Sequence, residues 1–236
     1  MNVRIVAVTK PLIANMTTAC DLVAFCARVS NKANQDKHHS AGRLIGHLVR
    51  NREWSPFEMA NMVVEVVTTR DIARQILRHR SFSFQEFSQR YAEVQSDPVY
   101  REARLQDVKN RQSSLEIQDP GFDAWWKDLQ AEVADTAMRA YGAAINAGIA
   151  KEVARAVLPE GLTESTMYIN GNIRSWIHYI ALRTMPATQK EHRIIAEQCK
   201  QVFCEQFPEL IDALDTAVAE LQLNFAKYLE VPTATV

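Results

Sequence analysis

The sequence predicts a helix-rich α+β fold with a small mixed sheet, in a single domain spanning residues 1–236. Three observations favour it. Short valine-rich segments alternate with helical patterns in the first third, and the second half is dominated by helical periodicity. No glycine-rich loop follows a strand, and the chain holds only seven glycines, which disfavours Rossmann and P-loop nucleotide binding.

The N-terminal third is predicted to alternate strands and helices. Residues 3–8 and 62–68 carry the valine-rich pattern of strands. Two helices are expected between them, at 18–29 and 40–50. A further helix is expected at 70–80, followed by an extended segment at 82–87.

The remainder is predicted to be mostly helical. Residues 95–121 turn polar, with Asp-Pro turn signals, and we expect a partly helical, mobile excursion there. One short strand is expected at 165–170. The later helices are expected at 123–147, 151–157, 172–184, 188–207 and 209–228.

Bulk composition excludes several classes of function. The net charge of −1 argues against general affinity for nucleic acid or anionic membranes, which needs a broad basic field. No apolar run approaches a membrane span and the N-terminus lacks the pattern of a signal peptide. The four cysteines match neither zinc nor redox spacing, so we expect buried free thiols in a reducing, cytoplasmic setting.

The most informative segment is RHRSFSFQEFSQRY, from Arg78 to Tyr91. Three arginines and a histidine within so few residues repel one another unless an anion lies among them, and guanidinium forks match phosphate and carboxylate. A solvated basic helix end is the alternative. On a helix over 70–80, Arg80 would enter the apolar side, so either the helix stops before it or Arg80 reaches a bound anion.

A second cluster lies between residues 154 and 193. On the helix expected at 172–184, Arg174 and His178 share a face and Arg183 lies almost opposite. Each residue alone also fits a structural role, His178 as a satisfied core imidazole and Arg183 in a cation–π pair. The two clusters together favour a ligand site.

The first cluster resembles the signature of the flavin-dependent thymidylate synthases: Arg-His-Arg, two variable residues, Ser, a variable residue, Asn-Glu, then Ser and Arg-Tyr after single variable residues. All fixed positions match except Gln85, which replaces Asn. The segment SPFEM, residues 55–59, also follows the family. Many members flank it with histidines where this chain has Glu53 and Met59, so only Ser55 is carried over.

The resemblance implies a homotetramer with composite active sites and FAD bound between subunits. It implies methylation of dUMP to dTMP, with methylenetetrahydrofolate as carbon donor and NADPH as reductant. The implied FAD contacts are Ser55, Arg78, His79, Arg80, Glu86, Asn172, Arg174 and His178. The implied nucleotide contacts are Gln75, Ile76, Leu77, Arg78, Glu86, Phe87, Ser88, Gln89, Arg90, Arg155 and Arg183.

Arg183 matches the family's arginine beside the uracil ring. A guanidinium there cannot act as a base, so its expected contribution is electrostatic. Ser88 has no clear activating base and is assigned to substrate binding. Because Arg174 and His178 point away from Arg183, we expect their helix to separate two pockets.

Two other readings remain open. One is a nucleic-acid binding protein that binds phosphates with the arginine-containing helix expected at 70–80 and with the basic loop 101–111. The other is a different flavin-dependent nucleotide methylase or uridylate-binding enzyme on the same scaffold.

Overall fold

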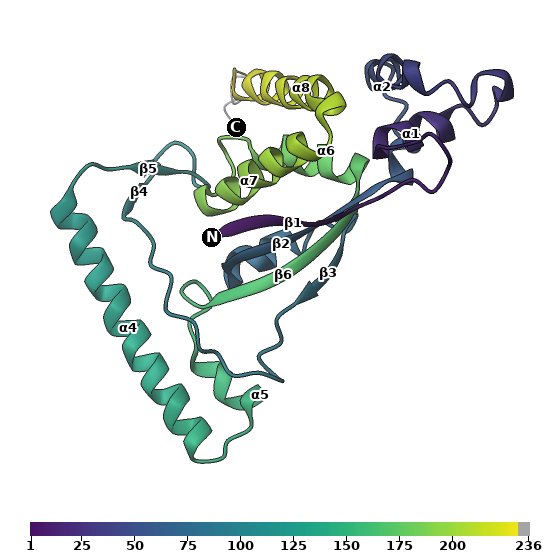
Figure 1. The fold of residues 1–236 in the computed structure, drawn as a ribbon. Coiled ribbons are helices and arrows are strands. Elements are labelled where there is room, and N and C mark those ends of the chain that lie inside the picture. Colours follow the sequence, from purple (N-terminus) through teal and green to yellow (C-terminus); the bar gives the residue numbers. More distant parts are fainter. Residues whose placement is uncertain (231–236) are drawn as a thin grey trace, which may run out of the picture. The chain divides into compact units, whose positions relative to one another are not determined.

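The computed structural model describes residues 1–230, which form two compact units interleaved along the chain (Figure 1). Unit 1 consists of Met1–Asn2, Val66–Arg78 and Phe84–Met167. Unit 2 consists of Val3–Glu65, His79–Ser83 and the chain from Tyr168 onward. The arginine-rich motif therefore changes unit twice within a few residues.

A four-stranded sheet has the order β1-β2-β6-β3. Its strands are Asn2–Val8 (β1), Asn61–Thr69 (β2), Ser83–Glu86 (β3) and Glu164–Asn172 (β6). They lie within about two residues of the expected positions at each end. In β2 alternate residues are buried, which is the two-residue period that predicted this strand. The sheet is antiparallel, a simpler pattern than the mixed sheet expected, and the α+β class is confirmed.

The two C-terminal helices of unit 2 pack on α6 (Ile173–Arg183), in which Trp176, Ile177 and Ile180 are fully buried. Helices α7 (Lys190–Gln206) and α8 (Ile211–Glu230) pack against it. The other elements of the unit are α1 (Ala19–Ala27), α2 (Ala41–Arg50) and the 3-10 helices η1 (Lys32–Asn34), η2 (His38–Ser40), η3 (Ser55–Met59) and η5 (Pro208–Leu210).

The start of α1 shows why these helices begin where they do. The Thr18 hydroxyl accepts a hydrogen bond from the Asp21 amide at 3.1 Å, and the Asp21 carboxylate accepts one from the Thr18 amide at 2.9 Å. This reciprocal capping box satisfies backbone donors that the first turn leaves unpaired.

Unit 1 is built on the long helix α4 (Pro120–Asn146), which Asp119 caps by accepting from the Phe122 amide at 3.0 Å. A small core joins it to the segments around Val94 and Leu158. The other elements are α3 (Arg70–Ile76), β4 (Arg104–Gln106), β5 (Ser114–Glu116), α5 (Lys151–Ala154) and the 3-10 helix η4 (Arg155–Val157).

The expected partly helical excursion at 95–121 is wrong. The segment holds no helix before α4; β4 and β5 form an antiparallel hairpin in which Leu105 pairs with Leu115. Its turn is fixed by Asp107, whose carboxylate accepts from the Lys109 and Asn110 amides at 2.8 and 3.1 Å. Such Asx turns favour tight loops over helix, which the polar composition alone does not reveal.

All four cysteines are free thiols. Cys20 and Cys199 are buried, as expected, and Cys26 and Cys204 are half-buried. Burial raises the pKa of each thiol, so these cysteines are held in the unreactive neutral form. Among the described residues, no helix combines the length and apolar character needed to cross a bilayer.

Candidate active site

The motif begins where α3 ends. The helix stops at Ile76, so Arg78, His79 and Arg80 lie in the connection to β3. Of the two possibilities for Arg80, the first holds: the helix ends before it, and its side chain is exposed. The end of β3 is tied to β6 because the Phe87 amide donates to the Thr166 carbonyl at 2.9 Å.

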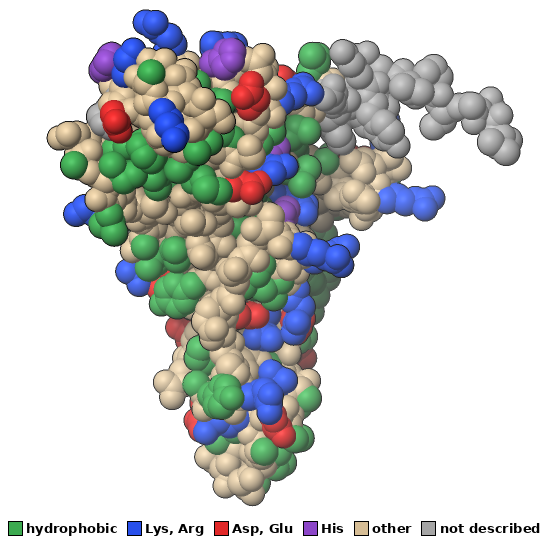
Figure 2. Space-filling view, turned by 90° about the vertical axis from the view of Figure 1, so that its right-hand side faces the viewer, with side chains coloured by type: hydrophobic (Ala, Val, Ile, Leu, Met, Phe, Trp, Pro, Cys, Tyr) green, Lys and Arg blue, Asp and Glu red, His purple; other side chains and the backbone are tan. Residues whose placement is uncertain are grey.

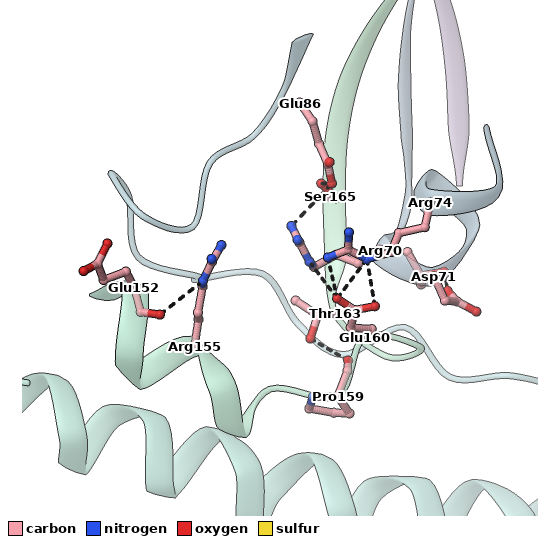
Figure 3. A network of polar contacts seen from close by, with 11 residues as sticks. Arg70, Asp71, Arg74, Glu86, Glu152, Arg155, Pro159, Glu160, Thr163 and Ser165 are labelled. Atoms are coloured by element: carbon pink, nitrogen blue, oxygen red, sulfur yellow. Dashed lines mark hydrogen bonds and ion pairs between the residues drawn. The ribbon is translucent and has the colours of Figure 1, made fainter. Parts of the chain in front are cut away.

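In unit 1 the motif carboxylate Glu86 is held by two partners (Figure 3). Its Oε1 accepts from the Ser165 hydroxyl at 2.8 Å and from the Arg70 guanidinium at 3.3 Å. Arg70 and Ser165 are both buried. A charge-assisted bond and a hydroxyl donor at one oxygen fix the carboxylate in place.

Two arginines of α3, Arg70 and Arg74, are paired with carboxylates within unit 1. Arg74 makes a bidentate pair with Glu160, with its Nη2 at 2.7 Å and its Nε at 2.9 Å from the two oxygens. The Arg74 hydrogen bond lowers the pKa of Glu160, with the charges of Arg70 and Arg155 adding to the effect. The expected anion among the arginines is thus supplied in part by the protein itself.

Arg90 and Arg155 come together at Glu152. Arg90 Nε donates to the Glu152 carboxylate at 3.2 Å, and Arg155 Nε donates to the Glu152 backbone carbonyl at 3.3 Å. Arg78 is exposed. Glu152 therefore contacts both arginines, through its carboxylate for Arg90 and through its backbone carbonyl for Arg155.

Other predicted substrate contacts differ in exposure. Ile76 is fully buried in the core, so only its backbone can meet a ligand, whereas Gln75, Leu77 and Ser88 are half-buried. Gln89 is buried, and its amide Nε2 has no hydrogen-bond partner among the described residues. A buried unsatisfied donor is costly unless a ligand supplies an acceptor.

In unit 2 the predicted flavin residues Ser55, Arg174 and His178 lie on two adjoining elements. Ser55 opens η3, and Arg174 on α6 forms a hydrogen-bonded ion pair with Glu58 of η3. The His178 ring packs edge-on against Trp54, with centroids 5.0 Å apart. Burial, with a contribution from the Arg174 charge, lowers the pKa of His178, so the imidazole is neutral near pH 7.

A cavity of about 310 Å³ opens beside this group. Its walls include Trp54 and His178, together with Ala181 of α6 and Ala217 of α8. Asn172 is a helix cap, since its side-chain oxygen accepts from the Ser175 amide at 2.8 Å. The cavity thus combines an aromatic ring, an imidazole and small apolar residues with the ion pair of Arg52 and Glu220.

The two clusters of the sequence meet at one hydrogen bond. Arg183 Nε donates to His79 Nε2 at 2.8 Å across 104 residues of sequence. Burial, aided by the Arg183 charge, lowers the pKa of His79 to about 4. The imidazole is therefore neutral at pH 7 and serves as the acceptor that orients the guanidinium.

Two further residues, Tyr179 and His192, stand behind this pair, and sequence reasoning missed His192. The Tyr179 ring meets His79 edge-on at 4.9 Å, and the Tyr179 hydroxyl lies 3.2 Å from His192 Nε2. His192 is fully buried, and burial, the Arg183 charge and the His79 charge lower its pKa to about 3. The helical phase placed Tyr179 beside Arg183, but His192 comes from α7 and carries no local signal.

The three side chains of α6 predicted to contact ligands have different neighbours, as their helical phases predict. Arg174 and His178 face η3 and Trp54, whereas Arg183 faces His79. The cavity lined by His178 does not include Arg183. Whether the two faces serve two ligands stays a prediction.

Comparison with known proteins places the chain in a class. A family model described as thymidylate synthase complementing protein matches residues 11–209. Two solved structures are similar along nearly the whole chain: a UMP/dUMP methylase, PolB, from Streptomyces cacaoi with 5-Br dUMP or with 5-Br UMP. These have TM-scores of 0.78 and 0.79 at 26% identity, and cover 91% and 92% of this chain and 94% of theirs.

Curated relatives narrow the class. The chain is 46% identical over 215 residues to a probable flavin-dependent thymidylate synthase of Paramecium bursaria Chlorella virus 1, covering 91% of this chain and 99% of the relative. It is 44% identical over 218 residues to a flavin-dependent thymidylate synthase of Synechocystis, covering 91% of this chain and all of the relative.

The chain belongs to the flavin-dependent thymidylate synthase family. The family expected from the motif is confirmed, and the nucleic-acid alternative has no support. On the face drawn in Figure 2, Lys and Arg side chains are interspersed with Asp and Glu. Such a surface lacks the broad basic field that nucleic acid requires.

Proposed function

We propose that the protein catalyses the reductive methylation of dUMP to dTMP. The methylene carbon of methylenetetrahydrofolate is transferred to the uracil ring, NADPH supplies two electrons, and tetrahydrofolate and NADP⁺ leave. The observation that carries the proposal is the hydrogen bond from Arg183 to His79, which joins the motif to the second cluster in a family member.

The donor set in unit 2 fits a flavin. His178 and Trp54 line the cavity, and on the adjoining elements Ser55 opens η3 and Arg174, paired with Glu58, would offer a cation for phosphate or for a polar ring edge. Within this unit, His79, Arg80 and Asn172 would complete the set, and the resemblance also assigns Arg78 and Glu86 to FAD. When bound, FAD supplies the hydride chemistry that reduces the transferred carbon.

The donor set in unit 1 fits a nucleotide monophosphate. Arg90 and Arg155, gathered at Glu152, would hold the phosphate together with Arg78. The unpaired amide of Gln89 would find an acceptor on the substrate. Glu86, fixed by Arg70 and Ser165, would accept from a sugar or base donor of the substrate.

Arg183 would act on the uracil ring by charge. Methylation requires an electron-rich ring carbon, and a fixed guanidinium beside the imide stabilises the negative charge that develops. The neutral His79 accepts a hydrogen bond from the guanidinium Nε and so fixes its orientation. No side chain is required as a nucleophile.

The principal alternative is a uridylate methylase acting on the ribonucleotide. The printed title of the similar PolB structures names both UMP and dUMP. The preference for dUMP rests on the identity of 44% and 46% to flavin-dependent thymidylate synthases, against 26% to PolB.

The assembly and setting proposed are a homotetramer with composite sites in the cytoplasm. Folate would dock at the same site as the flavin and the nucleotide. Four free cysteines agree with a reducing compartment.

The test is an anaerobic assay of the purified flavoprotein with NADPH, methylenetetrahydrofolate and either dUMP or UMP. We expect dTMP and tetrahydrofolate from dUMP, with UMP at least about tenfold poorer in kcat/KM. Methylation of UMP at an equal or higher rate would replace the proposal with the alternative. No methylation of either nucleotide by flavin-loaded protein would refute both.

A further inference from the structure

Helix α4 carries two different stripes along its length. The first is buried against unit 1 and is well satisfied. The side chain of Gln130 exchanges hydrogen bonds with the Arg101 backbone at 2.8 and 2.9 Å, and the Tyr141 hydroxyl accepts from the Val94 amide at 3.2 Å. This stripe fixes α4 within its own unit.

The second stripe, which we call the exposed seam, faces outward from the chain. Its members recur with spacings of three and four, without a charged residue: Trp126, Leu129, Val133, Thr136, Ala140 and Ala143. All six are exposed, and Trp126, Leu129 and Val133 leave 37%, 38% and 55% of their surface open. The alternating spacing is that of the a and d positions of a coiled coil.

The side chains of the exposed seam grow smaller from its start to its end. An antiparallel second copy would align Trp126 with Ala143, Leu129 with Ala140 and Val133 with Thr136. Each layer would then join a larger residue to a smaller one, which fills the interface evenly. A parallel copy would oppose tryptophan to tryptophan at one end and alanine to alanine at the other.

The charges beside the seam favour the same alignment. Glu132 and Arg139 both lie on one flank, and both are exposed. Arg139 Nη2 donates to the Thr136 hydroxyl at 3.3 Å, which places the guanidinium at the seam edge. In the antiparallel register each Glu132 faces Arg139 of the second copy, whereas a parallel copy would place Glu132 beside Ala137.

We propose that the exposed seam of α4 pairs antiparallel with the exposed seam of a second copy of this chain. The pairing is isologous, because the same surface serves both copies about a twofold axis near residues 133–136. It rests on the proposed homotetramer, to which it assigns one interface, and it depends on none of the ligands of the proposed function. A change in mass therefore tests the pairing separately from activity.

The first test measures mass by sedimentation for the full-length protein and its variants. Leu129→Lys buries a cation in each of two layers and is expected to halve the native mass, and Ala140→Glu is expected to do the same. Asp128→Lys, an exposed charge change off the seam, is the matched control and keeps the native mass. Circular dichroism checks that each variant remains helical.

The second test reverses the flanking charges. Glu132→Arg alone places an arginine opposite Arg139 of the second copy at both ends of the interface. It is expected to weaken association about tenfold or more at low salt. The double variant with Arg139→Glu restores opposite charges and is expected to recover native association. Failure of the double variant to recover would overturn the antiparallel register.

The third test reads orientation directly. Leu129→Cys and Ala140→Cys chains, mixed, unfolded, refolded together and oxidised, are expected to cross-link to each other and not to themselves, with the unsubstituted chain as control for the native cysteines. Self-linking of either variant would show a parallel pair. A monomeric native protein, or a folded Leu129→Lys or Ala140→Glu protein of native mass, would overturn the proposal.

Discussion

Gly171 in β6 lies close to Phe82 of the motif, and this distance sets how much stability a larger residue there should cost. A Cβ added at Gly171 would lie 2.2 Å from two ring carbons of Phe82 and 3.2 Å from Nε1 of Trp176. Carbon atoms pack at about 3.5–4.0 Å, so the Phe82 ring would have to move by more than about 1 Å. Phe82 is only 8% exposed and stacks 4.6 Å from Trp176, which leaves no room for that movement.

We therefore expect Gly171→Ala to lower the free energy of unfolding by about 3 kcal/mol, the upper end of the range for overpacking. Urea denaturation followed by tryptophan fluorescence measures it. Gly142→Ala is the matched control, because nothing lies within 4 Å of its Cβ, and it should stabilise α4 by about 0.5–1 kcal/mol. Adding Phe82→Leu should recover part of the loss as a coupling energy of about 1 kcal/mol.

A Gly171→Ala protein within about 0.5 kcal/mol of the native stability would refute this reasoning. The double variant with Phe82→Leu would also refute it if the two losses of stability simply added, because the loss from Gly171→Ala would then not arise at the Phe82 ring.

Three further predictions concern titration, the carboxylate support and a buried donor. Burial lowers the pKa of His79 to about 4 and that of His192 to about 3, below the ordinary 6.5. Between pH 6.5 and 4 the unfolded chain therefore binds more protons than the folded chain, so stability should fall as the pH drops through this range. Thermal unfolding of His192→Gln should show a shallower fall with pH. An unchanged slope would contradict this. Ser165→Ala removes one hydrogen-bond donor from Glu86 and should raise KM for dUMP about fivefold with kcat little changed. Steady-state kinetics measure this change, with the exposed Ser114→Ala as the control. Tyr141→Phe leaves a buried backbone N–H unpaired and should cost about 1–3 kcal/mol in urea denaturation, whereas no loss would mean that water replaces the phenol.

Local patterns accounted for much of the fold. The alternation in β2 and the helical phase of α6 are properties of neighbouring residues, so both elements and the opposed faces of Arg174 and Arg183 could be predicted. The end of α3 at Ile76 could not, because the pattern continued to Arg80 and only its charge argued for a stop. The hairpin of β4 and β5 was missed because its turn depends on one carboxylate, that of Asp107.

The motif named candidate site residues, but the contacts between distant segments were missed. The Arg183 to His79 bond spans 104 residues, and the ring of His192 reaches Tyr179 from another helix. Such contacts are set by packing, which a single sequence does not display. The carboxylates Glu152 and Glu160, which bind Arg90 and Arg74, were missed for the same reason.

The central claim is that Arg183, held by His79, stabilises charge on the uracil ring. The most direct measurement is the single-turnover rate of dTMP formation by flavin-loaded Arg183→Ala, with the exposed Arg50→Ala as control. We expect the rate to fall about 10²–10³-fold while flavin absorbance per subunit and the control stay at the native level. A native rate in Arg183→Ala would contradict the account.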